Sequence, residues 1–149
     1  MKQGYRKSWQ KTRLDPFLLF SKRQDLTPYT YTGNAGANTL SGSDGGDTLD
    51  GGAGNDSLSG GAGRDKFVFG TGFGSDRVND FTPGQDQLQL SKALGVSNFA
   101  GLDSNSNGVL DDADAAVSIA GNDTIITLGS NQIDIVGQTA LHDGDFAFV

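Results

Sequence analysis

The sequence contains no cysteine, no glutamate and a single histidine, His142. Without cysteine the chain can form neither disulfides nor cysteine-ligated metal sites, and cysteine usage says nothing of its compartment. One histidine excludes a zinc site of the His-Glu-x-x-His kind. All 18 acidic residues are therefore aspartate, which favours turns and loops, whereas glutamate is a helix former. The composition indicates β structure and loops rather than helices.

Long apolar runs are also missing, and none approaches the length of a transmembrane helix, so no membrane span is expected. Only 35% of the residues are hydrophobic and 23 are glycine, so a conventional packed core cannot be large. At 149 residues the chain allows one compact domain, with room for an appendage. A solenoid stapled by metal ions would explain how such a chain folds.

What the sequence does have is a nine-residue repeat. It occurs four times without a slip in register, over residues 33–41, 42–50, 51–59 and 60–68. Glycine stands at positions one and four of every repeat. Position six is Asn38, Asp47, Asp56 or Asp65, and position eight is Leu40, Leu49, Leu58 or Phe67. A fixed period with one apolar and one acidic position predicts a solenoid whose repeats stack on one another.

Each repeat can form a tight loop followed by a short strand. Glycine enters positive-φ conformations at little cost, so a Gly-Gly-x-Gly-x-Asp segment can turn several carbonyls the same way. The residues around position eight alternate polar, apolar, polar, which predicts a strand with one inward side chain. Calcium prefers six to eight oxygen ligands from carboxylates and carbonyls. A flexible linker is the alternative, but a linker has no reason to keep an apolar residue at every ninth position.

If two repeats make one full turn, residues eighteen apart lie on the same side of the coil. Asn38 then pairs with Asp56, and Asp47 with Asp65, around one ion each. A fifth unit, 71–79, follows with the register shifted by two and brings Asp76 to position six. The predicted calcium ligands of the repeat region are Asn38, Asp47, Gly52, Gly54, Asp56, Gly61, Gly63, Asp65, Asp76 and Asp80. The aromatic residues Phe67, Phe69, Phe73 and Phe81 are expected to close the end of the solenoid.

A second calcium-type pattern covers residues 103–114, which resemble an EF-hand loop with oxygen donors at positions 1, 3 and 5, Gly108 at position 6 and Leu110 at position 8. Position 12 is aspartate instead of the usual glutamate, and clear flanking helices are missing, so weak binding on the order of 10⁻⁴ to 10⁻³ M is expected. An Asx-rich turn that binds no ion is the alternative. By that resemblance the ligands are Asp103, Asn105, Asn107, the carbonyl of Val109, Asp111 directly or through water, and Asp114.

The repeats resemble the repeats-in-toxin (RTX) nonapeptide Gly-Gly-x-Gly-x-Asp-x-apolar-x. Residues 51–59 and 60–68 fit it fully, whereas the first repeat departs at Asn34 and Asn38 and the second at Ser43. The resemblance implies an all-β fold, with a parallel β-roll over residues 29–81 that binds several calcium ions between its turns and folds in a calcium-dependent way. The site that uses Asn38 is expected to be the weakest.

Residues 82–149 are expected to cap the roll with antiparallel β structure and short helical turns, and this part looks like the C-terminal region of serralysin-type secreted proteins. Residues 87–90 alternate as a strand does, and 91–102 suit one or two helical turns. The apolar runs 116–120, 124–128 and 132–136 are separated by turn residues. Asp145 followed by four hydrophobic residues resembles the uncleaved C-terminal signal of type I secretion substrates. A final strand is a compatible alternative.

Residues 1–28 differ from the rest, with seven basic and two acidic residues. Their apolar stretch, 17–20, is shorter than a signal peptide needs, so no N-terminal signal peptide is expected. A basic arm for nucleic acid or membrane is supported only by the charge. We favour a poorly ordered lead-in and predict no nucleic-acid partner.

The favoured function is a non-catalytic, calcium-dependent folding and type I secretion module of an extracellular protein. A carbohydrate-binding module, as RTX-like repeats are in mannuronan epimerases, is one alternative, although the acidic repeat region would repel an anionic polysaccharide. The other alternative is the C-terminal part of a secreted protease, lipase or epimerase, with a catalytic or toxin domain upstream. Catalysis by this chain alone is not expected.

Overall fold

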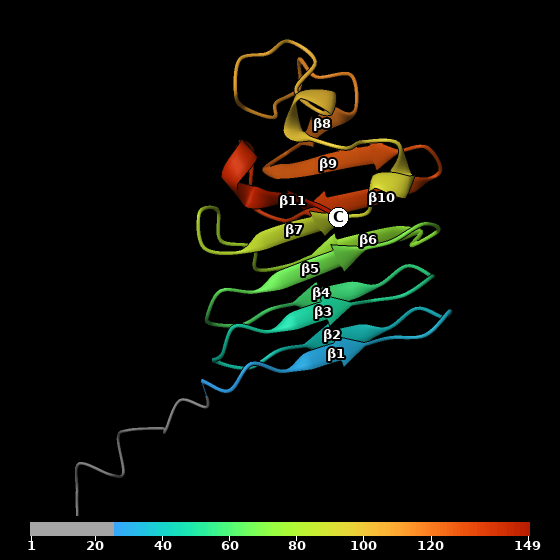
Figure 1. The fold of residues 1–149 in the computed structure, drawn as a ribbon, viewed down its shortest axis with the longest axis vertical. Helices are drawn as coiled ribbons and strands as arrows, with labels where there is room; N and C mark the ends of the chain where they lie inside the picture. Colours follow the sequence, from blue (N-terminus) through green and yellow to red (C-terminus); the bar gives the residue numbers. More distant parts are fainter. Residues whose placement is uncertain (1–25) are drawn as a thin grey trace, which may run out of the picture.

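The computed structural model describes residues 26–149, which form two β-sheets whose strands stack along the long axis of the molecule (Figure 1). Within this range no α-helix occurs, and the helical elements are three short 3₁₀ turns. None of the described helices is long and apolar enough to cross a membrane. The basic lead-in predicted for residues 1–28 lies almost entirely outside the described residues.

Strands that follow one another in the repeats alternate between the two sheets, so two repeats make one coil. Sheet A consists, in order, of β1 (Thr30–Thr32), β3 (Thr48–Asp50), β5 (Lys66–Phe69), β7 (Gln87–Leu90) and β11 (Phe146–Phe148). Sheet B consists of β2 (Thr39–Ser41), β4 (Ser57–Ser59), β6 (Ser75–Val78), β10 (Asn131–Ile135), β9 (Asp123–Leu128) and β8 (Val117–Ala120). Sheet A is parallel throughout, and sheet B is parallel from β2 to β10.

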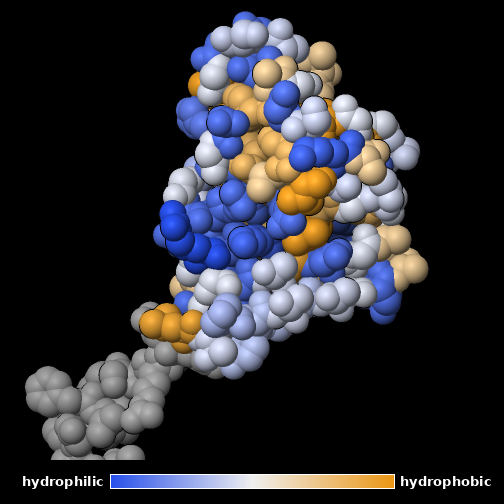
Figure 2. Space-filling view, viewed as in Figure 1, coloured by the Kyte–Doolittle hydropathy of each residue, from blue (hydrophilic) through white to orange (hydrophobic). Residues whose placement is uncertain are grey.

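The position-eight side chains form the core between the sheets, as the alternating pattern predicts. Leu49 pairs with Phe67 in sheet A and Leu40 with Leu58 in sheet B. Of these four, only Leu40 in the first coil is not fully buried. In the face shown in Figure 2, the first coils are pale to blue, and most hydrophobic surface lies over the later coils and the cap. The buried hydrophobic residues of the core run from Leu49 to Phe146, and the apolar residues of β1 and β2, Tyr31 and Leu40, are only partly buried.

The two-residue shift after the fourth repeat is accommodated in a turn before β6. Val78 pairs with Leu58, twenty residues earlier instead of eighteen, which confirms the fifth unit of the sequence analysis. The longer turn lets Phe73 fold back against Phe69, with ring centroids 5.1 Å apart. Phe73 and Phe69 are both buried, so the shift adds aromatic mass to the core without breaking the stack.

The C-terminal region contains the predicted helical turns, η1 (Lys92–Leu94) and η2 (Phe99–Gly101), and the predicted antiparallel strands β8, β9 and β10. A third turn, η3 (Asp143–Asp145), precedes β11. Beyond the prediction, β10 pairs in parallel with β6, and β11 with β7. Both solenoid sheets thus continue into residues 82–149. The predicted division of the chain near residue 81 stays a prediction.

Candidate functional site

The position-six residue of each of the four repeats lies at the end of a loop, directly before a strand, and contacts its equivalent one coil away, whereas Asp76 of the fifth unit lies within β6. The backbone N–H of Asn38 donates to Asp56 Oδ1 at 2.7 Å, and the N–H of Asp56 donates to Asp76 Oδ1 at 2.9 Å. On the other side, the N–H of Asp47 donates to Asp65 Oδ1 at 2.7 Å. The structure therefore brings together the predicted pairs, in two ladders that run along the coil.

Asp86 continues the second ladder and is a residue that sequence reasoning missed. Its Oδ1 accepts a hydrogen bond from the N–H of Asp65 at 3.0 Å, and its Oδ2 accepts one from the N–H of Thr82 at 2.9 Å. The signal is present in the sequence, because residues 81–89 form a sixth nonapeptide with Gly84, Asp86 and Leu88 at positions four, six and eight. It is hidden because Phe81 replaces the first glycine and Asp80 stands as an extra residue.

The two consensus loops, 51–56 and 60–65, use the glycines for close approach between coils. Gly52 and Gly61 have φ of 88° and 95°, and Gly54 and Gly63 have φ of 130° and 128°. A Cβ on Gly61 would lie 2.2 Å from the carbonyl oxygen of Ser43, and a Cβ on Gly52 would lie 2.7 Å from that of Asn34. Main-chain carbonyls of one coil therefore point at the glycines of the next, as a cradle of oxygen ligands requires.

The same two loops contain an unpartnered carboxylate oxygen. The Oδ2 atoms of Asp56 and Asp65 are buried and have no hydrogen-bond partner, and these residues are only 2% and 1% exposed. A buried charged oxygen without a partner is costly, and native proteins rarely leave one. The donor set of carbonyls and carboxylates fits a hard cation such as calcium, which would supply the missing partner.

Burial and mutual repulsion raise the pKa of several ladder carboxylates. Burial raises the pKa of Asp65 to about 6, helped by the charges of Asp86, Asp47 and Asp80 and opposed by the hydrogen bond from the N–H of Asp47. Burial likewise raises the pKa of Asp76 to about 7, and the charges of Asp56 and Asp50 add to it against the hydrogen bond from the Asp56 N–H. No positive group is among the causes of these shifts, so the ionised carboxylates are held in the fold at a cost in free energy.

Burial also raises the pKa of Asp86, against the hydrogen bonds that it accepts. Asp80 differs from the ladder residues, because its two oxygens accept hydrogen bonds from the N–H groups of Gly60 and Gly61 at 2.9 and 3.0 Å. Asp80 thus braces the fourth loop, and its role as a ligand stays a prediction. In residues 26–149 no three acidic or histidine side chains gather as a metal-binding group, so a site here depends on main-chain carbonyls.

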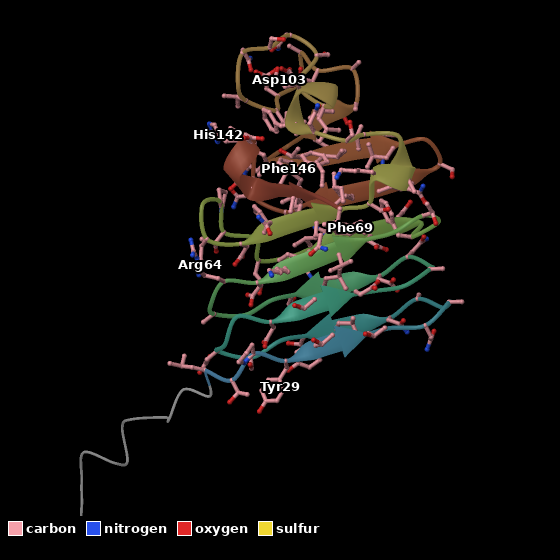
Figure 3. The ribbon with its side chains drawn as sticks, viewed as in Figure 1. Tyr29, Arg64, Phe69, Asp103, His142 and Phe146 are labelled. Carbon is pink, nitrogen blue, oxygen red and sulfur yellow. The ribbon has the colours of Figure 1, made fainter. Side chains whose placement is uncertain are left out.

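The EF-hand-like loop lies at the far end of the molecule from the first coil, as the positions of Asp103 and Tyr29 show in Figure 3. Asp103 accepts from the N–H groups of Asn107 and Gly108, and Asp114 accepts from those of Ser104 and Asp111.

The loop is closed on itself by its own amides. Asn107 accepts at its Oδ1 from the N–H of Val109 and donates to Asp111, and the Oδ1 of Asn105 accepts from the N–H of Asn107. Burial would raise the pKa of Asp114, but the hydrogen bonds from the N–H groups of Asp111, Asn105 and Ser104 outweigh it and lower that pKa. The predicted ligands are brought into one ring, without an orphaned buried oxygen among them.

Comparison with known proteins places the repeat segment in a family. Residues 32–67 match the RTX calcium-binding nonapeptide repeat in four copies. This segment belongs to the RTX calcium-binding repeat family. The match covers the four loops and strands whose ladders are described above, and it identifies the two-sheet coil as an RTX β-roll. No curated protein matches the chain by sequence at a significant level.

Two solved structures share this fold. An extracellular lipase from Serratia marcescens aligns with a TM-score of 0.56 at 19% identity over 80% of the chain, and a subunit of the mannuronan C5-epimerase from Azotobacter vinelandii aligns with a TM-score of 0.52 at 27% identity over 80%. The aligned region is 21% of the lipase and 77% of the epimerase subunit. The chain thus spans about a fifth of the lipase, and this likeness shows the RTX fold.

Proposed function

We propose that the RTX segment binds calcium through loops 51–56 and 60–65, and that this binding drives folding of a non-catalytic module of an extracellular protein. The buried, unpartnered Oδ2 atoms of Asp56 and Asp65 carry the proposal. They occur in the two repeats that fit the RTX consensus in full. The carbonyls that face the glycines of these loops supply the remaining oxygen donors.

Bound calcium would supply positive charge and oxygen coordination between the coils. The carboxylates of Asp65, Asp76 and Asp86, whose pKa values are raised without it, stand where that charge is needed. Because the ligands come from different coils, the unfolded chain contains no such site. Binding free energy then becomes folding free energy. Calcium is scarce inside cells and abundant outside, so folding would follow export.

The other predicted ligands differ in how strongly we propose that they bind calcium. Asp76 belongs to the first ladder and is buried, so it is proposed as a ligand beside Asp56. Asn38 offers an amide instead of a carboxylate, and we propose it only for a weak site. The loop 103–114 is proposed as a second, weaker calcium site, because its donor residues already form a closed ring.

We also propose export by type I secretion through the C-terminal residues. The sequence of Asp145 and the four hydrophobic residues after it supports this reading, and one of the proteins that share the fold is an extracellular lipase. A translocation assay with the last five residues deleted tests it, and export that is unaffected by the deletion would contradict it.

The calcium proposal is tested by circular dichroism and isothermal titration calorimetry on the whole chain, starting from calcium-free protein. We expect a calcium-specific gain of β structure, which magnesium does not reproduce at the same concentration. Asp56→Asn and Asp65→Asn should each weaken binding, whereas Asp44→Asn, which removes the same charge from the second repeat, should not. A chain that is fully folded without calcium and unmoved by its addition would overturn the proposal.

Carbohydrate binding is a second candidate because of one pocket in the roll. A pocket of about 290 Å³ is lined by Arg64, Lys66, Gln85 and Gln87, which can contact sugar hydroxyl and carboxylate groups. Asp65 and Asp86 line the same pocket and oppose an anionic sugar. Affinity electrophoresis in neutral and uronate polysaccharide gels would test this, with Arg64→Ala and Lys66→Ala as the variants.

A further inference from the structure

The four repeat loops fall into two classes of backbone conformation. In the consensus loops the position-two glycines, Gly52 and Gly61, are in the left-handed region with φ of 88° and 95°. In the first coil that position holds Asn34 and Ser43, and neither has a positive φ. A residue with a Cβ resists the left-handed region, which glycine enters freely. The residue at position two therefore sets the form of the loop.

The two classes also differ in what the position-six oxygen contacts. In the second repeat the N–H of Ser43 donates to Asp47 Oδ2 at 2.6 Å, and the Ser43 hydroxyl donates to the same oxygen at 2.9 Å. In the first repeat the N–H of Asn34 donates to Asn38 Oδ1 at 2.7 Å. In both loops the backbone N–H at position two thus donates to the side chain at position six, and the accepting oxygens of Asp47 and Asn38 already have a hydrogen-bond partner.

In the consensus loops the backbone N–H at position two does not donate to the position-six side chain of its own loop. The N–H of Gly52 donates to Asp50 Oδ1 at 3.0 Å, and the N–H of Gly61 donates to Asp80 Oδ2 at 3.0 Å. Asp56 Oδ2 and Asp65 Oδ2 are left without a partner. The difference between Asp47 and Asp65 is thus not one of residue type or burial, because both are buried aspartates of one ladder.

We propose that Ser43 keeps the carboxylate of Asp47 out of calcium coordination, so that Asp47 is a structural residue of the first coil and not a calcium ligand. The inference rests on the proposed function, because it assigns which position-six carboxylates of the RTX repeats bind the ion. The Ser43 amide occupies the oxygen that the ion would use. A glycine at position 43 would let the loop adopt the open form of Gly52 and Gly61, and would release Asp47 Oδ2 for calcium.

The test compares the calcium stoichiometry of Ser43→Gly, Ser43→Ala and the unaltered chain by isothermal titration calorimetry. We expect Ser43→Gly to bind one more ion per chain. Ser43→Ala removes the hydroxyl but keeps the Cβ and the amide hydrogen bond, so its stoichiometry should be unchanged. In Ser43→Gly, the further change Asp47→Asn should remove the added ion. Equal stoichiometry in Ser43→Gly and the unaltered chain would overturn the inference.

A second measurement keeps the inference testable if Ser43→Gly does not fold. Asp47→Asn in the unaltered chain should leave calcium affinity within about twofold, because Asp47 binds no ion, whereas Asp65→Asn in the same ladder should weaken it roughly tenfold or more. Equal losses in the two variants would overturn the inference while leaving calcium binding intact. No calcium binding by the unaltered chain would overturn the proposed function itself, and the assignment of loops with it.

Discussion

The backbone N–H of Asp47 donates to the carboxylate of Asp65 across 2.7 Å, from one coil to the next. The two oxygens of the Asp65 side chain therefore differ in what they contact. Oδ1 accepts the hydrogen bond from the neighbouring coil, and Oδ2 has no hydrogen-bond partner. The hydrogen bond to Oδ1 requires only an acceptor, whereas the cost of the unpartnered Oδ2 comes from the negative charge. Substitutions at position 65 can separate the effect of the hydrogen bond from the effect of the charge.

Asp65→Asn should keep the hydrogen bond and lose the charge, whereas Asp65→Ala should lose both. In calcium-free buffer at pH 7.5 we expect Asp65→Asn to be more stable than the unaltered chain by about 1–3 kcal/mol, because a buried carboxylate with a raised pKa is neutralised. Asp65→Ala should be less stable by about 1–3 kcal/mol, because the Asp47 N–H loses its acceptor. Urea unfolding measures both, and equal effects of the two variants would contradict this separation.

Gly61→Ala should destabilise the roll strongly, whereas Gly70→Ala should not. Gly61 has a φ of 95°, and a Cβ there would lie 2.2 Å from the Ser43 carbonyl oxygen. We expect a loss of about 2 kcal/mol or more, from backbone strain and the displaced coil. A Cβ on Gly70 meets no atom within 4 Å, so its effect should stay within about 0.5 kcal/mol. Thermal unfolding with and without calcium is the measurement, and similar losses for both variants would argue against the coil contact.

The calcium-free fold should lose stability as the pH rises from 4 to 7.5. The pKa values of Asp65 and Asp76 rise from 3.8 to about 6 and about 7 in the folded chain. Between pH 3.8 and these raised pKa values, the folded chain binds more protons than the unfolded chain, so the free energy of unfolding falls with increasing pH. The stabilisation is complete below pH 3.8 and is lost as the pH passes through about 6 and 7. Urea unfolding at pH 4.5 and 7.5 in calcium-depleted buffer checks the sign.

A double variant, Asp65→Asn with Asp76→Asn, is the matched control for the pH effect and should make the dependence shallower, with the raised pKa of Asp86 as a remaining contribution. Saturating calcium should reverse it, because protons then compete with the ion for the carboxylates. A calcium-free stability that rises between pH 4.5 and 7.5 would contradict the ladder interpretation.

Asp114→Ala should destabilise the loop 103–114 even without calcium. The carboxylate of Asp114 accepts hydrogen bonds from the N–H groups of Ser104 and Asp111, and its removal leaves these donors without their acceptor. We expect a loss of about 2 kcal/mol. Asp112→Ala, at an exposed position of the same loop, should change stability by less than about 0.5 kcal/mol. Hydrogen exchange of the loop amides would locate the effect, and unchanged protection in Asp114→Ala would contradict it.

The strands and the ladder pairs could be predicted from the sequence because both follow from a strict period. Position eight must face inward and position six must precede the strand, so Leu49 pairs with Phe67 and Asp47 contacts Asp65 once two repeats make a coil. The two-residue shift at Val78 was also visible, because Asp76 and Val78 keep their spacing within the shifted unit.

What escaped prediction depends on long-range pairing or on loop energetics. The parallel pairing of β11 with β7 joins Phe146 to Leu88, which lies 58 residues earlier in the chain, and no local pattern encodes it. Asp86 was hidden by irregular spacing. The conformation of the second repeat loop depends on whether the Ser43 N–H or an ion contacts Asp47 Oδ2. The residue types alone do not reveal the outcome of this competition.

The alternation of successive repeats between sheets A and B has a consequence for how such a chain can change length. Adding or removing one nonapeptide within residues 33–68 would move β6, β7 and the cap strands β10 and β11 to the opposite sheets together. The pairs β10–β6 and β11–β7 would therefore be kept, because all four strands lie after the repeats in the chain. The roll can thus change length in steps of nine residues, one loop and one strand at a time, while the cap moves along the axis as a unit.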